Sequence, residues 1–280
     1  DAKLITSQLS SEGIYGFAAN MKGAQSALSR SLTKQAEREL GVKFGYDFKT
    51  GRYDFTGYEN LVSAWKTLMS PECAFPGCES LDIDPLRTQF AAGKIGMYMS
   101  FTHAEPGVYQ SQFPMEQEWG CAQLPVTGGK VVGAESYQPL NGYLFNAKSE
   151  NLDAAWKVYR AIFSNVDVLK EYYEQGYGIS TVPAVIENAK PAQYYIDNPD
   201  LLITDTDAVY PQAPHEANVD AMIVEGQNMY ETMAEMILGD MDIKSGLQNL
   251  TDRYNLALDT GIAEGAGEEI KIDNFDPMHP

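Results

Sequence analysis

The sequence predicts an α/β protein built from two lobes. Its 280 residues are enough to form two lobes of ordinary size. Helical patterns with an apolar stripe recur along the chain, and short runs with the two-residue period of strands lie between them. Residues 84–103, DPLRTQFAAGKIGMYMSFTH, contain both patterns, which predicts a helix, a glycine stop and a strand in direct succession.

This same segment indicates where a ligand would bind. Asp84 is expected to cap the helix, Pro85 fits its first position, and Gly93 stands where a left-handed residue ends such a helix. Residues 95–99 then alternate as a strand does. The strand would present residues 100–103 at its carboxyl end, where open α/β sheets bind their ligands.

Further elements are expected in the first part of the chain. Residues 12–20 are expected to form a strand, and residues 23–40 a helix that Gly41 stops. A hairpin is expected over residues 44–55, because aromatic side chains lie on both arms and Gly51 follows Thr50 at the turn.

Two tryptophans are expected in the core. Thr56 and Glu59 form a predicted capping box ahead of a helix in which Trp65 lies on the apolar stripe. A second, strongly amphipathic helix is expected over residues 149–165, with Trp156 on its apolar face. The helical spacing therefore predicts that both indole rings are buried.

The rest of the chain is expected to cross between the lobes twice and then to close with two helices. The Gly-rich residues 125–140 form the first predicted crossing, followed by a strand over residues 141–147, and residues 198–214 form the second. Helices are expected over residues 216–238 and from Asp242 onward. The polar tail after the last helix is expected to be loosely held.

The charge of the chain argues against nucleic acid as a partner. The formal net charge is −19 and the pI is about 4.4, whereas surfaces that bind phosphate need clustered Lys and Arg. We interpret the acidity chiefly as a source of solubility. No apolar run approaches the roughly 20 residues that span a bilayer. Because the chain begins with Asp1 rather than Met, we expect it to have been shortened by processing or by design.

The three cysteines leave two states open. Cys73 and Cys78 bracket the sequence CAFPGC, whose Pro-Gly pair favours a tight turn. They can therefore form a disulfide in an oxidising compartment or remain free thiols. Cys121 adds no second ligand pair, so a structural zinc site is not expected. The acidic run from Asp205 to Asp207 is interpreted as a solvated loop rather than a calcium site.

The sequence carries no motif of a known catalytic site. It contains no G-x-S-x-G elbow, Walker loop, H-E-x-x-H or C-x-x-C, and its three histidines are far apart. We therefore expect no enzyme activity, no cofactor and no metal. A secreted hydrolase that acts on carbohydrate and a surface adhesion or scaffold protein remain the alternatives, the first predicting turnover and the second no small-molecule cleft.

Several motifs, in their order along the chain, resemble the solute-binding proteins of ABC importers, especially the maltose-binding-protein-like ones for sugars and oligosaccharides. The pattern F-x-x-G-x-x-x-M runs from Phe90 to Met97. The segments GIYGF, YDFTGYENLVSAWKTLM, WGCAQLPVTGGK, NGYLFNAKSENLDAAWKVYRAIFSN and YYEQGYGISTVPAV are similar to successive segments of that family. Each motif is weak alone, and their common order carries the resemblance.

The resemblance implies a periplasmic-binding-protein-like two-lobe α/β fold of type II, with an incomplete N-terminal lobe. Residues 1–136 would form the first part of the C-terminal lobe, and residues 137–207 the retained part of the N-terminal lobe. Residues 208–280 would add the closing helices and the tail of the C-terminal lobe. In such proteins, the missing part carries a lipoprotein or secretion signal.

The resemblance also implies a function without chemistry. The protein would capture an extracellular solute, in the first place a carbohydrate, and deliver it to the permease subunits of an ABC transporter by hinge closure of its lobes. It would be a monomer in the extracellular or periplasmic space, anchored as a lipoprotein in its full-length form. A polyamine, a peptide and a metal remain alternative ligands.

Three regions are expected to line the ligand cleft. The first is the start of the helix after residues 12–20, where free N–H groups can meet a polar ligand. The second is residues 100–103, where sugar-binding relatives carry a Gly-Pro-Trp-like sequence that this chain replaces. The third consists of the two crossings. The predicted ligand-binding residues are Asn20, Lys22, Gln25, Ser100, Phe101, Thr102, His103, Tyr137, Gln138, Asn141, Tyr210, Gln212 and His215. Helix capping, core packing and ordinary surface loops are the alternative roles of these side chains.

Overall fold

The structure is a computed structural model that describes residues 1–102, 105–137, 144–217 and 222–280. The chain divides into two compact units. The first unit contains Asp1–Ser100, Leu124–Tyr137 and Asp205–Pro280, and the second contains Phe101–Gln123 and Gln138–Thr204. Among the described residues, none of the helices has the length and apolar content that a membrane span requires.

The unit boundaries differ from the predicted lobe boundaries at Tyr137, at residues 205–207 and, over the longest stretch, at residues 101–123. Residues 101–123 group with the second unit, whereas the sequence analysis assigns them to the lobe that contains residues 1–136. Local packing explains this grouping. Gly107 lies so close to Gly176 that an added Cβ would stand 3.1 Å from the Gly176 carbonyl oxygen, and the backbone of Cys121 donates to the side chain of Asn198.

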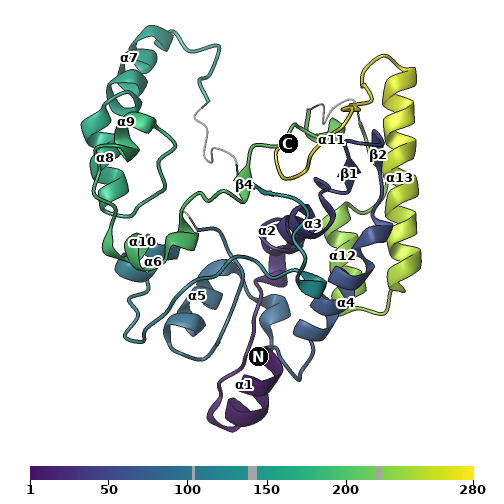
Figure 1. The fold of residues 1–280 in the computed structure, drawn as a ribbon, viewed down its shortest axis with the longest axis horizontal. Coiled ribbons are helices and arrows are strands. Elements are labelled where there is room, and N and C mark those ends of the chain that lie inside the picture. Colours follow the sequence, from purple (N-terminus) through teal and green to yellow (C-terminus); the bar gives the residue numbers. More distant parts are fainter. Residues whose placement is uncertain (103–104, 138–143, 218–221) are drawn as a thin grey trace. The chain divides into compact units, whose positions relative to one another are not determined.

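The first unit is rich in helices (Figure 1). Its helices are α1 (Ala2–Leu9), α2 (Ala24–Leu28), α3 (Leu32–Leu40), α4 (Glu59–Leu68), α5 (Ile83–Ala91), α11 (Pro214–Ala217), α12 (Met229–Leu238) and α13 (Ile243–Ala263). Its strands are β1 (Tyr46–Asp47) and β2 (Arg52–Tyr53), which pair antiparallel, and β3 (Glu135–Ser136) and β4 (Asp207–Ala208), which pair parallel. The predicted hairpin is confirmed, with Gly51 in the left-handed conformation at its turn.

Two predicted strands are reduced to isolated bridges. In residues 12–20, Tyr15 pairs with Ile95 as a single parallel bridge, and the predicted strand over residues 95–99 does not extend further. Gly16 packs against the first helix, where an added Cβ would stand 2.0 Å from the carbonyl oxygen of Ala2. A helix thus lies against this segment, in place of a longer strand pairing.

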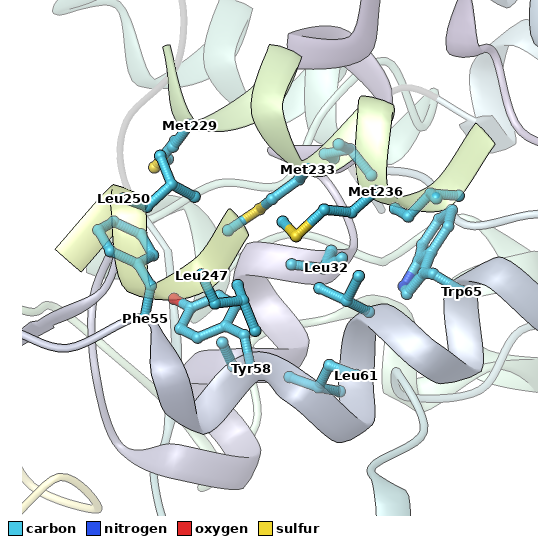
Figure 2. Packing of buried hydrophobic residues seen from close by; sticks show 14 of the residues in the cluster. Leu32, Phe55, Tyr58, Leu61, Trp65, Met229, Met233, Met236, Leu247 and Leu250 are labelled. Atoms are coloured by element: carbon cyan, nitrogen blue, oxygen red, sulfur yellow. The ribbon is translucent and has the colours of Figure 1, made fainter. Parts of the chain in front are cut away.

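The core of the first unit lies between α4, α12 and α13 (Figure 2). Met233 and Met236 project from α12 into the space between this helix and α4, which carries Leu61 and Trp65, and all four side chains are buried. The predicted burial of Trp65 is confirmed, and its indole N–H donates to the side-chain oxygen of Gln35 at 2.7 Å. Burial of each such side chain contributes roughly 1.5–3 kcal/mol.

Helix boundaries in the first half follow the sequence only in part. The helix predicted over residues 23–40 is split between α2 and α3, where Ser31 donates its hydroxyl back to the carbonyl of Ala27 at 2.7 Å. Gly41 ends α3 with φ +70°, as expected. The Asp84 cap is wrong, because Asp82 caps α5 instead.

The predicted capping box ahead of α4 is also wrong. Thr56 donates its hydroxyl to Asp54 at 2.6 Å, inside a tight turn, and no side chain caps α4. The Thr56 hydroxyl binds the Asp54 carboxylate in an Asx-type turn and is therefore not available to cap the helix, because Asp54 lies only two residues away.

The closing helices are placed as expected, but the first of them is shorter. α12 begins at Met229 rather than at residue 216, since Asn228 and Glu231 form a capping box. The Asp242 cap of α13 is confirmed by its bond from Ser245 N–H.

The tail after α13 is held firmly against the first unit, contrary to the prediction. Phe275 is buried in the main core, and Ile272 N–H donates to the Phe48 carbonyl at 2.8 Å. Ala134 N–H and the Tyr210 hydroxyl both donate to the carbonyl of Pro277 at 2.8 Å. Burial of the Phe275 ring and these hydrogen bonds hold the tail in place, although most of its residues are polar.

The second unit is built from shorter helices. They are α6 (Glu105–Ser111), α7 (Leu152–Phe163), α8 (Val166–Glu174), α9 (Pro183–Ile186) and α10 (Gln193–Asp197). Its hydrophobic cluster contains four buried residues, Tyr173, Val185, Tyr195 and Leu201. Gly176 follows α8 in the left-handed conformation, which ends this helix.

The predicted burial of Trp156 is wrong. α7 forms at the expected place but contributes no buried residue, and Trp156 is 51% exposed. Its ring stacks on Tyr159 of the same helix, with centroids 5.5 Å apart, and meets Phe145 at 6.1 Å. The strand expected over residues 141–147 is absent from its described part, residues 144–147.

Of the two states that the sequence leaves open for Cys73 and Cys78, the structure shows the second, since both are buried free thiols, and Cys121 is free as well. Cys73 packs into the main core of the first unit, whereas Cys78 belongs to a separate small cluster with Leu86 and Ile95. Each sulfur is thus held in its own apolar environment, and burial raises the pKa of the Cys78 thiol.

Candidate functional site

α3 is buried on all sides although it carries several charged residues. Lys34, Glu37 and Arg38 are each at most 6% exposed. Lys34 Nζ lies 3.2 Å from both carboxylate oxygens of Glu37, one turn along the helix. Because buried charges need partners, this ion pair is the starting point of the candidate site.

Ser136 of β3 completes the ion pair. Its backbone N–H donates to Glu37 Oε2 at 2.7 Å, and its hydroxyl donates to Glu37 Oε1 at 2.8 Å. Lys34 Nζ donates to the Ser136 carbonyl at 2.8 Å and also to the Ser136 hydroxyl. These bonds fix β3 against α3 and give the charged groups of Lys34 and Glu37 hydrogen-bond partners, which makes the local arrangement rigid.

β3 and β4 bring two segments that are distant in the sequence side by side. Glu135 lies opposite Asp207 in the parallel register, and Tyr137 N–H donates to the Ala208 carbonyl at 3.0 Å. The chain passes from the first unit to the second after Tyr137 and returns at Asp205. The two segments that the sequence analysis takes as crossings therefore run together at this point.

The charges at this crossing are unusual. Burial raises the pKa of Glu135 to about 7; Lys34 opposes the shift, and the carboxylates of Glu37 and Asp207 add to it. Glu135 can thus hold or release a proton near neutral pH. The Nε and Nη1 atoms of Arg38 are buried without a hydrogen-bond partner among the described residues.

The first group of predicted site residues lies around the start of α2. Asn20 is buried, and its Nδ2 donates to the Ser26 hydroxyl at 3.1 Å, so its amide serves the packing of this turn and does not cap the helix. Lys22 is exposed, with Nζ 3.6 Å from Asp82 Oδ2. Gln25 is exposed on α2.

The second group lies where the chain passes from the first unit to the second. Ser100 ends one stretch of the first unit and Phe101 begins the second unit. Both side chains are half-buried, and Thr102 is exposed. His103 lies outside the described residues.

The third group is divided between surface and core. Tyr137 is half-buried directly after β3, and Gln138 and Asn141 lie outside the described residues. Tyr210 is buried against Phe275, with ring centroids 6.0 Å apart. Gln212 is exposed.

His215 is engaged within the first unit. Its Nδ1 lies 3.1 Å from the Tyr53 hydroxyl, and burial lowers the pKa of its imidazole. The structure thus gives Asn20, Tyr210 and His215 bonds and contacts inside the first unit.

Sequence reasoning missed the residues that tie β3 to α3. Lys34 and Glu37 are three positions apart, the spacing of an ordinary exposed helical pair. The sequence predicts one continuous helix over residues 23–40, and charges on such a helix ordinarily mark the side that faces solvent. Only their position opposite Ser136, about a hundred residues later, shows that they are buried partners.

No family model and no curated protein matches this sequence. Solved structures do match. One described as a chitin oligosaccharide binding protein has 14% identity and a TM-score of 0.58, over 93% of this chain and 64% of that chain. A sugar transporter protein from Bacillus licheniformis, in complex with stachyose, has 14% identity and a TM-score of 0.60, over 91% and 64%.

A third solved structure is an ABC transporter solute binding protein from Agrobacterium radiobacter K84, in complex with ribitol. It has 17% identity and a TM-score of 0.60, over 91% of this chain and 62% of that chain. The chain thus spans less than two thirds of the length of these three proteins. Its fold is nevertheless the two-lobe α/β fold that sugar-binding solute-binding proteins of ABC transporters share, as the sequence predicts.

Proposed function

We propose that this protein captures a solute, in the first place a carbohydrate, and delivers it unchanged to the permease of an ABC transporter. One observation carries the proposal: more than nine-tenths of the chain takes the fold of proteins described as binding a chitin oligosaccharide, stachyose and ribitol. In this proposal the protein is not an enzyme. It acts as a monomer outside the cytoplasmic membrane, anchored as a lipoprotein.

The proposal assigns a part to each unit. The first unit corresponds to the C-terminal lobe, and the second to the retained part of the N-terminal lobe. We assign the paired strands β3 and β4 to the hinge, since two of the four crossings between the units, after Tyr137 and before Asp205, lie next to this pair in the chain. The hydrogen bonds from α3 to Ser136 support this role, because they fix β3 to the first unit, and a hinge segment must be held firmly on one side.

The proposed binding residues are the predicted ones whose side chains remain available. Lys22, Gln25, Thr102 and Gln212 are exposed and can donate to or accept from the hydroxyl groups of a sugar. Ser100, Phe101 and Tyr137 are half-buried near the unit boundaries, where an aromatic ring can stack on a sugar face. His103, Gln138 and Asn141 stay predictions from the sequence.

Thermal denaturation of the protein with a panel of solutes tests the proposal. The panel contains stachyose, a chitin oligosaccharide, ribitol and, for the alternative ligand class, spermidine. A sugar is expected to raise the melting temperature progressively with its concentration, because binding stabilises the folded protein by about 2.7 kcal/mol at a hundredfold excess over Kd. Mass spectrometry is expected to recover that sugar intact.

Two variants connect binding to the proposed residues. Lys22→Ala and Gln25→Ala are expected to weaken the sugar-dependent shift without changing the melting temperature of the free protein. Lys244→Ala, an exposed lysine of α13 that pairs with Glu59, serves as the matched control. Cleavage of a sugar would favour the hydrolase alternative, a shift with spermidine alone would favour a polyamine, and no shift at all would reject solute capture by this chain.

A further inference from the structure

His215 occupies an aromatic pocket within the first unit. It belongs to α11, which follows the second crossing. The rings of Phe44, Tyr53 and Tyr254 surround the imidazole, with centroid distances of 5.6, 6.0 and 5.8 Å. The three rings come from the chain before β1, from β2 and from α13. A residue at the end of the crossing is thus held by the hairpin and the last helix.

Two hydrogen bonds to one hydroxyl hold His215 in place. The backbone N–H of His215 donates to the Tyr53 hydroxyl oxygen at 3.2 Å. The same oxygen lies 3.1 Å from Nδ1 of the imidazole. A hydroxyl that accepts from the backbone can donate its own proton to Nδ1, which requires the neutral imidazole with Nδ1 unprotonated. Among the residues that the structure describes, the other acceptor near this hydroxyl is Met222 Sδ at 3.8 Å, which is a weak one.

The charged groups around His215 form a second set of contacts. Lys43 Nζ lies 3.2 Å from Glu216 Oε2 and donates to the Pro211 carbonyl at 3.3 Å. Glu216 also accepts from the backbone N–H of Ala213 at 2.9 Å. The carboxylate next to His215 is therefore already shared between an ammonium group and a backbone donor.

These neighbours shift the pKa of the His215 imidazole in opposite directions. Burial lowers the pKa of His215, the Glu216 carboxylate opposes that effect, and the Lys43 ammonium adds to it. The phenols of Tyr53 and Tyr254 face the imidazole as well, and burial raises the pKa of both, so they stay neutral. Tyr230 of α12 faces Glu216, and burial likewise raises its pKa.

We infer that His215, Tyr53, Lys43 and Glu216 form a pH-sensitive latch that holds residues 210–217 on the β1–β2 hairpin at neutral pH and releases them when His215 is protonated. The imidazolium cannot accept the Tyr53 proton, and it adds a positive charge beside Lys43 in a pocket of three rings. This inference goes beyond solute capture and does not rest on it.

The direction of the pH effect follows from linkage. In the released segment, the imidazole regains its ordinary pKa of about 6.5, so the released state binds the proton more tightly than the latched state. Opening of the latch is therefore expected to increase by up to about tenfold per pH unit below pH 6.5, until the lower pKa of the latched form is reached. Above pH 7 the opening should not depend on pH through this group.

Hydrogen exchange of the whole chain, followed by mass spectrometry, measures this opening. Exchange is recorded at pH 7.5, 6.5 and 5.5, with exchange times scaled for the intrinsic rate at each pH. Peptides that cover residues 208–217 are expected to lose protection by up to about fivefold between pH 6.5 and 5.5. Peptides from α4 and α12 are expected to keep theirs, since they belong to the core and carry no such group. Equal loss in all three would indicate global destabilisation and overturn the latch.

Variants separate His215 from other titrating groups. His215→Gln is expected to abolish the additional loss of protection at acid pH. His279→Gln is the matched control, because His279 is an exposed histidine of the same unit, with Nδ1 2.9 Å from Asp276 Oδ2. This control should behave as the wild type does.

If His215→Gln fails to fold, the wild-type protein still decides the question. The Cε1 proton of His215, followed by NMR, is expected to titrate below pH 6.5 and to broaden as the segment opens. Titration at or above pH 6.5 with unchanged protection of residues 208–217 would refute the latch.

Discussion

The two units use the same kind of amphipathic helix with opposite results. In the first unit, Trp65 of α4 is 1% exposed and lies beneath α12. In the second unit, Trp156 of α7 is 51% exposed, and Val158 and Ile162 beside it are 60% and 45% exposed. The difference teaches that helical spacing defines an apolar face but not whether anything covers it, because that depends on elements from elsewhere in the chain.

Replacement of the two tryptophans should give the largest contrast between the units. Trp65→Ala is expected to lower the free energy of unfolding by about 3–5 kcal/mol, because it leaves a cavity and removes the donor to Gln35. Trp156→Ala, the matched variant, should change it by less than about 1 kcal/mol. Urea denaturation followed by far-UV circular dichroism measures both, and equal losses would contradict the comparison.

Disruption of the buried ion pair between Lys34 and Glu37 should cause the next largest loss of stability. Lys34→Met is expected to cost about 3–5 kcal/mol, because it leaves the Glu37 carboxylate buried without its cation. Lys244→Met, which breaks the exposed pair with Glu59, should cost less than about 1 kcal/mol. The same urea experiment measures both variants. If Lys34→Met lowers the free energy of unfolding no more than Lys244→Met does, the pair is not buried as described.

The crossing should make the stability of the first unit depend on pH. The pKa of Glu135 is raised to about 7, so the folded state holds its proton more tightly than the unfolded chain. The contribution of this group is complete below pH 4 and is lost as the pH rises through 7, with a total of roughly 2–3 kcal/mol. Glu135→Gln should remove this slope from urea midpoints measured between pH 5 and 8, and Glu59→Gln should leave it unchanged.

The two asparagine caps should give the smallest contrast. Asn228 caps α12 in the first unit and Asn165 caps α8 in the second, each through bonds from two backbone N–H groups. Asn228→Ala is expected to lower global stability by about 1 kcal/mol. Asn165→Ala should instead increase hydrogen exchange in α8 alone, since few buried contacts couple this helix to a larger core. A global effect of Asn165→Ala would show that the second unit is better coupled than its burial indicates.

Local features of the fold were predictable from the sequence. Gly51 at the hairpin turn, Gly41 at the end of α3 and Asp242 at the start of α13 are each placed as expected. In these cases, the backbone conformation or the hydrogen bond is set by one residue and its neighbours within one turn. Where two local signals competed, as for Thr56 and Asp54, the sequence did not reveal which would win.

The candidate site was predictable only as a region. The sequence points to the two crossings, and β3 and β4 do pair there. It does not reveal that Tyr210 donates to Pro277 or that His215 bonds to Tyr53, because both partners lie far away in the chain. It also missed Lys34, whose charge suggested solvent.

By itself, therefore, the sequence determined the fold class, the helix stop at Gly41, the cap at Asp242, the hairpin and the apolar stripes of the long helices. Only the tertiary structure decided which stripes are covered, that the charges of α3 are buried against Ser136, that Cys73 and Cys78 remain apart, and that Phe275 anchors the tail. The physical reason is the range of the interactions. Turns and caps depend on contacts within a few residues, whereas burial depends on surfaces that residues a hundred or more positions away bring together.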